Sequence, residues 1–227
     1  MRRDCLNDAV IALHRMRAAA DIPFGIFGGH AISVLGGFRE SKDIDCLASV
    51  TKEQILAVLD GKGGFVAIPQ EWQDYVAFLW SDSHDRNDLV LVEVFCEKFA
   101  GAVYTMDNIQ TTIRTVKGQH FGTGHTSFLD PFLIFKGKLR AAATRDEFHD
   151  SADLRWLATH YGHAIQARRD ELNPEYIGLA MKRYPELELL FRRLGLDIAR
   201  VRRLTRDLSP SRLPPHGPGD VHRGLLG

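Results

Sequence analysis

The chain has 227 residues and contains 29 lysine and arginine residues against 29 aspartate and glutamate residues, so its formal net charge is zero. Hydrophobic residues make up 44% and charged residues 26%, values close to the globular average that exclude wholesale disorder and fibrous repeats. The neutral balance excludes a uniformly basic nucleic-acid-binding surface and allows only a local basic patch. At roughly 150 residues per domain, the length predicts one large domain or a domain with an appendage.

Cysteine use and the N-terminal segment indicate the compartment. The three cysteines, Cys5, Cys46 and Cys96, lie far apart in apolar contexts, and neither they nor the ten histidines show zinc-site spacing. This pattern favours a reducing environment over a disulfide framework. The N-terminus lacks the apolar core of a signal peptide, and the longest apolar runs fall far short of a membrane span. We therefore expect a cytoplasmic protein without a membrane partner.

The first half of the chain reads as mixed α/β. Apolar residues at three- and four-residue spacing predict a helix over residues 5–20. The capping-box pattern Thr51-Lys-Glu-Gln54 predicts a second helix that ends near Gly61. A helical turn is expected over 30–35, and a glycine-rich loop over 118–124. The expected strands are 24–27, 44–48, 65–68, 75–80, 89–95 and 109–116.

The second half reads as helical, from Asp130-Pro131 onward, because a proline in the first turn favours a helix start. Beyond Ser209 the chain is rich in proline and glycine and poor in apolar residues, which predicts a disordered tail. We thus expect an α+β protein with three parts: an α/β domain over 1–129, a helical domain over 130–208 and a tail over 209–227. The expected helices are 130–143, 150–161, 174–183, 186–194 and 198–208.

A glycine pair and the carboxylates that follow it are candidates for a functional site. Gly28 and Gly29 follow a predicted strand, where glycines allow a sharp turn that exposes backbone N–H groups to a phosphate. Asp43 and Asp45 follow at i, i+2 spacing, which points both carboxylates to one face of a strand, where they can share hard cations. Glu93 lies between Val92 and Val94 in an apolar strand, where a carboxylate is costly without a partner. Turn solvation for the aspartates and an outward-facing glutamate are the ordinary alternatives.

This order of residues resembles the nucleotidyltransferase fold of the polymerase β superfamily. In that family a strand, a glycine pair and a short helix precede two strand-borne carboxylates, and a later strand supplies a third. A second stretch, Lys138-Leu-Arg-Ala141 through Arg145 to Asp150 and Asp153, is similar to the signature of nucleotidyltransferases related to the AbiEii toxins. The chain departs from the family pattern at His30, after the glycine pair, and at His149. Lys136 competes with Lys138 for the lysine position, and the spacing to Ala141 favours Lys138.

The resemblance implies a nucleotidyltransferase-type mixed sheet with flanking helices, followed by a helical bundle that completes the active-site cleft. It also implies NMP transfer from an NTP, with one or two Mg²⁺ ions as cofactor and with release of pyrophosphate. The implied metal ligands are Asp43, Asp45 and Glu93, and these three with Lys138 are the implied catalytic residues. The implied nucleotide-binding residues are Gly28, Gly29, Arg39, Lys42, Lys138, Arg145, Asp150 and Asp153. Arg39 and Lys42 either steer the triphosphate or solvate the loop.

The acceptor that the resemblance implies is a hydroxyl of RNA or tRNA, of a protein or of a small molecule. Arginine-rich helices over Arg192–Arg206 offer a contact for an RNA backbone, with solvated, ion-paired helix faces as the alternative. DNA is not expected as a partner. A competing hypothesis is a catalytically inactive module of the same fold that binds nucleotide or RNA. A sugar-nucleotide glycosyltransferase would explain Asp-x-Asp but not the pattern from Lys138 to Asp153.

Overall fold

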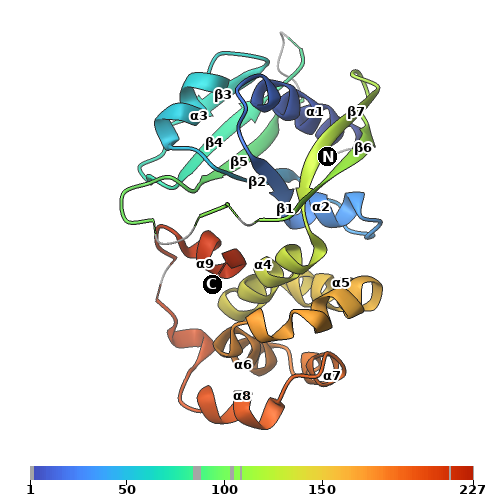
Figure 1. The fold of residues 1–227 in the computed structure, drawn as a ribbon, viewed down its shortest axis with the longest axis vertical. Helices are drawn as coiled ribbons and strands as arrows, with labels where there is room; N and C mark the ends of the chain where they lie inside the picture. The colour runs from blue at the N-terminus through green and yellow to red at the C-terminus, as the bar shows by residue number, and fades with distance from the viewer. Residues whose placement is uncertain (1–2, 84–87, 103–104, 108, 215, 227) are drawn as a thin grey trace. The chain divides into compact units, whose positions relative to one another are not determined.

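A computed structural model of the chain describes residues 3–83, 88–102, 105–107, 109–214 and 216–226. The chain divides into two compact units, Met1–Asp130 and Pro131–Gly227, which Figure 1 follows by colour along the chain. The first unit, here the sheet unit, contains a seven-stranded mixed sheet, and the second, the helical unit, is built from helices in its described part. The predicted α+β class is confirmed. None of the described helices has the length and apolar character needed to cross a membrane.

The sheet places β2 at its centre, between an antiparallel and a parallel neighbour. Its strand order is β3-β4-β5-β2-β1-β7-β6. β2 pairs antiparallel with β1 and parallel with β5, so residues from three chain segments meet along it. The strands are β1 (Phe24–Phe27), β2 (Asp43–Ala48), β3 (Phe65–Ile68), β4 (Tyr75–Trp80), β5 (Val90–Cys96), β6 (Thr111–Lys117) and β7 (Thr123–Leu129).

The two faces of β2 and β5 differ in chemistry. Ile44, Cys46, Val92 and Val94 are fully buried, while the residues that alternate with them include carboxylates that are only half-buried. The helix α1 (Arg3–Ala19) contacts β2, β5 and β7 and covers apolar sheet surface with its buried side chains. Two more helices complete the unit, α2 (Gly28–Val34) and α3 (Lys52–Leu59), and α3 begins at the capping box that the sequence predicts. The strand period of two thus separates an apolar face from a polar one.

The strand β7 is a correction to the sequence analysis, which placed a glycine-rich loop over 118–124 and no strand after it. Thr123–Leu129 forms a hairpin with β6 over seven paired positions, and it also joins β1 in parallel through Ile26 and Phe128. Its first residues, Thr-Gly-His-Thr, carry no apolar alternation. Pairing with β1 and β6 on its two edges therefore stabilises this strand, although its own sequence lacks the alternation typical of a strand.

In the helical unit, α4 (Pro131–Thr144) contacts α5, α6 and α9. Most of its side chains are buried, including Phe132, Phe135 and Leu139. The other described helices are α5 (Phe148–Ala167), α6 (Pro174–Arg183), α7 (Leu187–Arg193), α8 (Ile198–Leu204) and α9 (Asp220–Leu226), with short 3₁₀ turns η1 (Arg169–Glu171) and η2 (Pro210–Arg212).

The predicted tail over 209–227 is a second correction, although residues 215 and 227 lie outside the described part of the chain. The segment contains η2 and α9, and Leu225 of α9 is fully buried. A Cβ added at Gly137 would lie 2.9 Å from Cδ2 of Leu225, which shows that α9 packs closely on α4. The apolar residues after Pro218 anchor the chain end by burial.

Candidate active site

Three carboxylates meet on the polar face of the sheet. Asp43 and Asp45 lie on β2, and the parallel register places Asp45 directly beside Glu93 of β5. Residues two apart on a strand share a face, so the three side chains project from the same side. All three are intermediate in exposure. Sequence spacing predicts the aspartate pair, and the register brings the glutamate to it.

The glycine pair lies against these carboxylates and requires glycine for two reasons. Gly28 has φ +69°, a left-handed conformation that side chains disfavour, and a Cβ there would collide with the Asp45 carboxylate. A Cβ at Gly29 would lie 2.7 Å from Oγ of Ser41 and 3.2 Å from Cζ of Arg39. The bare backbone of both glycines therefore faces the polar side chains of β2 and of the preceding loop.

Hydroxyl groups hold two of the carboxylates. Ser41 donates to Oδ1 of Asp43 at 3.0 Å, and the Tyr75 hydroxyl donates to Oε1 of Glu93 at 2.5 Å. Neither Asp43 nor Glu93 forms an ion pair within the described residues. Burial raises the pKa of Glu93, the Tyr75 hydrogen bond lowers it, and the charge of Asp43 raises it, with a net increase. Burial and Glu93 together raise the pKa of Tyr75, which keeps the phenol a donor.

These donors suit a hard divalent cation. Carboxylate oxygens are the protein ligands that Mg²⁺ prefers, and a cation would relieve the repulsion that contributes to the raised pKa of Glu93. The sequence analysis did not identify Ser41 or Tyr75. Ser41 lies two residues before Asp43, so its sequence position could have identified it as a hydrogen-bond donor to Asp43. Tyr75 reaches Glu93 only through the β4–β5 pairing, which sequence spacing does not reveal.

A second group with metal-ligand chemistry occurs in the sheet unit. Within the described residues, Asp8, Asp82 and His120 bring three potential ligand atoms within 4.8 Å of one another, a tighter group than the three carboxylates of the sheet face. However, the Asp8 carboxylate accepts backbone N–H groups of Gln119, His120 and Phe121 at 2.9, 2.9 and 2.8 Å. Asp8 therefore anchors the β6–β7 turn to α1.

The remaining predicted residues of the sheet unit flank the carboxylates. Arg39 is half-buried beside Gly29, and Lys42 is exposed. His30, whose size at this position suggests crowding of or contact with a phosphate, is instead fully buried beside Phe128, with 6.3 Å between ring centroids. Neither of its ring nitrogens has a hydrogen-bond partner in the described structure. Burial, with a smaller effect of Arg3, lowers the pKa of His30 to about 3.

In the helical unit the structure brings Lys138, Arg145, Asp150 and Asp153 together. Nζ of Lys138 lies 3.1 Å from Oδ1 of Asp150 and 2.9 Å from Oδ2 of Asp153, and the lysine is only 5% exposed. Arg145 donates to both Asp150 oxygens, at 2.7 and 3.0 Å. Burial raises the pKa of Asp150, but Arg145 and Lys138 outweigh burial and hold it below its usual value. His149 is partly exposed, 3.8 Å from Asp150.

The arginines between residues 192 and 206 divide into two groups. Glu188 pairs with Arg192 at 2.7 Å and with Arg202 at 2.5 Å. In the described part of the chain, four exposed arginines have no ion pair, namely Arg193, Arg200, Arg203 and Arg206.

Comparison with solved structures gives the fold. The chain is similar to the crystal structure of an antigenic nucleotidyltransferase-like protein from Paracoccidioides brasiliensis, with a TM-score of 0.57, 17% identity, and coverage of 83% of this chain and 93% of that chain. Two structures of ANT(2")-Ia align less well: the complex with adenylyl-2"-tobramycin has a TM-score of 0.49 and 17% identity over 75% of this chain and 99% of that one. The solution structure has a TM-score of 0.47 and 18% identity over 83% and 98%. No family model and no curated protein sequence matches the chain. The chain thus has a nucleotidyltransferase-like fold.

Proposed function

We propose that the protein is a Mg²⁺-dependent nucleotidyltransferase that moves NMP from an NTP to a hydroxyl acceptor and releases pyrophosphate. One observation carries this proposal, namely the placement of Asp43, Asp45 and Glu93 on one sheet face against the backbone of Gly28 and Gly29. An acidic cluster beside glycine backbone that carries no side chain suits a metal-bound triphosphate better than it suits a bare anion.

Each proposed site residue of the sheet unit then has a defined role in the reaction. Asp43 and Asp45 would hold the metal ions, which neutralise charge on the triphosphate when bound. Glu93, kept in place by Tyr75, would complete the metal site and accept the proton of the acceptor hydroxyl. The acceptor oxygen then forms its bond to the α-phosphorus while the bond from that phosphorus to the bridging oxygen of pyrophosphate breaks. The backbone N–H groups at Gly28 and Gly29 would bind the phosphate oxygens, with Arg39 and Lys42 beside them.

In the helical unit, we propose that Lys138 and Arg145 bind the triphosphate, as in the AbiEii-type signature. Lys138 has three N–H donors, and Asp150 and Asp153 accept two of them, so the two aspartates orient the third. Arg145 is about half exposed and can share its guanidinium between Asp150 and a ligand. The unpaired arginines Arg200, Arg203 and Arg206 support an RNA acceptor among the hydroxyl acceptors considered.

The test is calorimetric titration of the four NTPs into the protein, in Mg²⁺ and in EDTA. It is followed by incubation of α-labelled NTPs with total RNA and with cell lysate. The Asp43→Asn/Asp45→Asn variant should keep its circular dichroism spectrum and lose Mg²⁺-dependent binding and label transfer, each by at least about 100-fold. The matched control is Glu71→Gln/Asp107→Asn, which removes two exposed carboxylates of the same unit and should behave as wild type.

Three results would count against the proposal. Unchanged Mg²⁺-dependent affinity in the aspartate variant would remove these residues from the site. Tight NTP binding without transfer to any RNA, protein or small molecule would favour the inactive binding module. The absence of NTP binding in wild type would mean that the fold is used for something else.

A further inference from the structure

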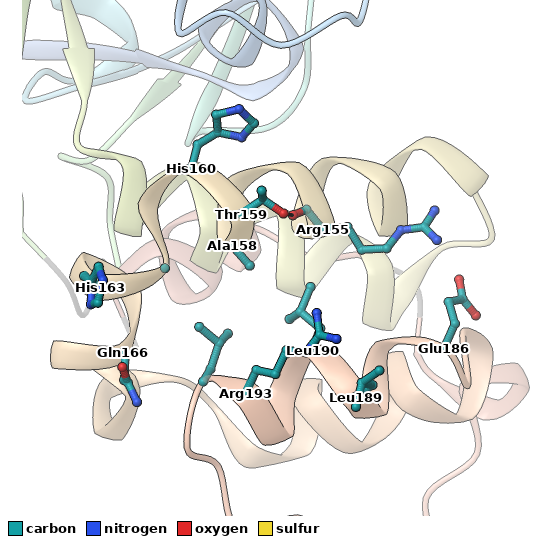
Figure 2. A pocket seen from close by; sticks show the side chains of 12 residues that line it. Arg155, Ala158, Thr159, His160, His163, Gln166, Glu186, Leu189, Leu190 and Arg193 are labelled. Carbon is teal, nitrogen blue, oxygen red and sulfur yellow. Dashed lines mark hydrogen bonds between the residues drawn. The ribbon is translucent and has the colours of Figure 1, made fainter.

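A groove runs between α5 and α7 of the helical unit, and its lining contains none of the residues proposed to bind metal or nucleotide. Figure 2 shows the two helices side by side, with Leu190 and Arg193 of α7 directed toward α5. The groove encloses about 560 Å³. Its α5 wall contains the twelve residues from Arg155 to Gln166 and bends at Tyr161, whose backbone angles are not helical. At about 1.5 Å rise per residue the wall is at most about 16 Å long, or three helical turns.

The floor of the groove is apolar and incompletely filled. Ala158, Leu190 and Leu194 line it, together with Leu189, which is 57% exposed. At Gly162, in the middle of the α5 wall, an added Cβ would meet no heavy atom within 4 Å. The exposed Leu189 beside this unfilled apolar floor makes the groove a candidate binding surface.

The rim of the groove is basic. Some surface arginines of the helical unit pair with nearby acids, as Arg192 does with Glu188 and Arg168 with Glu171. Arg155 and Arg193, one on each wall, have no ion pair within the described residues. The described lining adds His160 and His163 and one carboxylate, Glu186. An apolar floor between unpaired cations calls for an anionic ligand with an apolar stripe.

We propose that this groove docks an acidic amphipathic helix of a partner protein. A helix of about three turns matches the length of the groove, its leucine-like residues would cover Leu189 and fill the space at Gly162, and its acids would pair with Arg155 and Arg193. The rim residues are exposed, so the groove would leave a small molecule largely in solvent, whereas a helix brings its own polar outer face. RNA phosphates would satisfy the arginines but leave the leucines uncovered.

The experiment selects helical 16-residue peptides from a display library on the full-length chain and counter-selects on Gly162→Trp. The space at Gly162 accepts a Cβ, so the tryptophan blocks the groove without a backbone clash, and circular dichroism checks that the variant is folded. If it does not fold, Arg193→Glu replaces it in the counter-selection. The selected sequences should carry apolar residues at i, i+3 or i+4, and i+7, flanked by Asp and Glu.

Charge reversal then tests the pairing. Synthetic copies of the selected peptides should bind Arg155→Glu and Arg193→Glu at least 10-fold more weakly than wild type. Copies with Lys in place of the acids should regain affinity for those variants. Arg200→Glu, an exposed unpaired arginine of α8 outside the groove, is the matched control and should bind as wild type does.

Several results would overturn the proposal: no sequence that depends on the groove, selected sequences without acids, or affinity that charge reversal leaves unchanged. Displacement of the peptide by single-stranded RNA, with RNA binding that needs Arg155 and Arg193, would reassign the groove to RNA. The peptide should bind the Asp43→Asn/Asp45→Asn variant with wild-type affinity. Docking and nucleotidyl transfer can therefore fail independently.

Discussion

Each unit of the molecule gathers carboxylates, and the two clusters have opposite electrostatics. On the sheet, Ser41 and Tyr75 donate hydroxyl hydrogen bonds to Asp43 and Glu93, and the pKa of Glu93 is raised. Among the helices, Lys138 and Arg145 bind Asp150, and its pKa is lowered. Burial raises the pKa in both clusters, so the partners decide the sign.

The two clusters differ in whether their own side chains balance their charge. Two cations and two carboxylates cancel in the helical cluster, which needs no further ligand for its own stability. In the sheet cluster, Asp43 and Glu93 accept hydrogen bonds from neutral hydroxyl groups and form no ion pair within the described residues. The same residue types therefore form a charge-balanced cluster in the helical unit and the proposed metal site in the sheet unit.

Removing the cation from the helical cluster should have the largest effect on stability. Lys138→Met leaves two buried carboxylates without their lysine, and loss of one partner of a buried ion pair costs about 3–5 kcal/mol. Urea unfolding followed by circular dichroism measures the loss. The control is Lys136→Met on the same helix, where the lysine is equally buried but pairs with no carboxylate in the described structure. Equal losses in the two variants would show that Lys138 matters for packing alone.

Adding a side chain at the glycine that contacts the sheet cluster should have the next largest effect. Gly28→Ala forces a Cβ into the Asp45 carboxylate at a φ of +69°, which should lower the free energy of unfolding by about 2–3 kcal/mol and abolish Mg²⁺-dependent NTP binding. Gly61→Ala has the matching φ of +70° with nothing within 4 Å of the added Cβ, so it isolates the backbone strain of about 1 kcal/mol. NTP binding that survives Gly28→Ala would remove the glycine pair from the site.

The two clusters also differ in how far sequence can predict them. Asp43 and Asp45 share a face because of the strand period, and the glycine pair precedes them in a local pattern, so both features are visible in sequence. The pairing of Glu93 with Asp45 depends on the β2–β5 register, which joins segments nearly fifty residues apart. Tyr75 reaches Glu93 from the diagonal position of a third strand. Long-range pairing of this kind leaves no local pattern, and neither does β7, which two partner strands create.

His30 is buried like Lys138, but its ring nitrogens have no hydrogen-bond partner within the described residues. Its ring lies beside Phe128. Burial, with a smaller effect of Arg3, lowers the pKa of His30 to about 3. The unfolded chain, with a histidine pKa of about 6.5, then binds more protons than the folded chain as pH falls below 6.5. Folding stability is therefore full above pH 6.5 and is lost on acidification.

Between pH 7 and pH 5, wild type should lose about 2 kcal/mol more than His30→Leu, because only wild type carries this proton linkage. Urea unfolding at the two pH values measures the difference. His125→Leu, an exposed histidine of β7, should follow the wild-type dependence. Parallel losses in wild type and His30→Leu would show that other groups control the acid response.

The smallest effect should come from removing the Tyr75 hydroxyl, which donates a hydrogen bond to Glu93 in the sheet cluster. Tyr75→Phe removes the donor to Glu93, lowers the free energy of unfolding by about 1 kcal/mol, and leaves the glutamate free to turn away from Asp45. We expect a 3- to 10-fold fall in kcat and a higher Mg²⁺ concentration for half-activation, with KM for the NTP nearly unchanged, because the glycine pair and the β2 aspartates stay in place. Tyr184→Phe, which removes a 3.4 Å contact with Asp146 in the helical unit, should change neither. An unaltered Mg²⁺ dependence in Tyr75→Phe would assign the tyrosine to packing against Phe95, 5.3 Å away between ring centroids, and would leave Glu93 oriented by its strand alone.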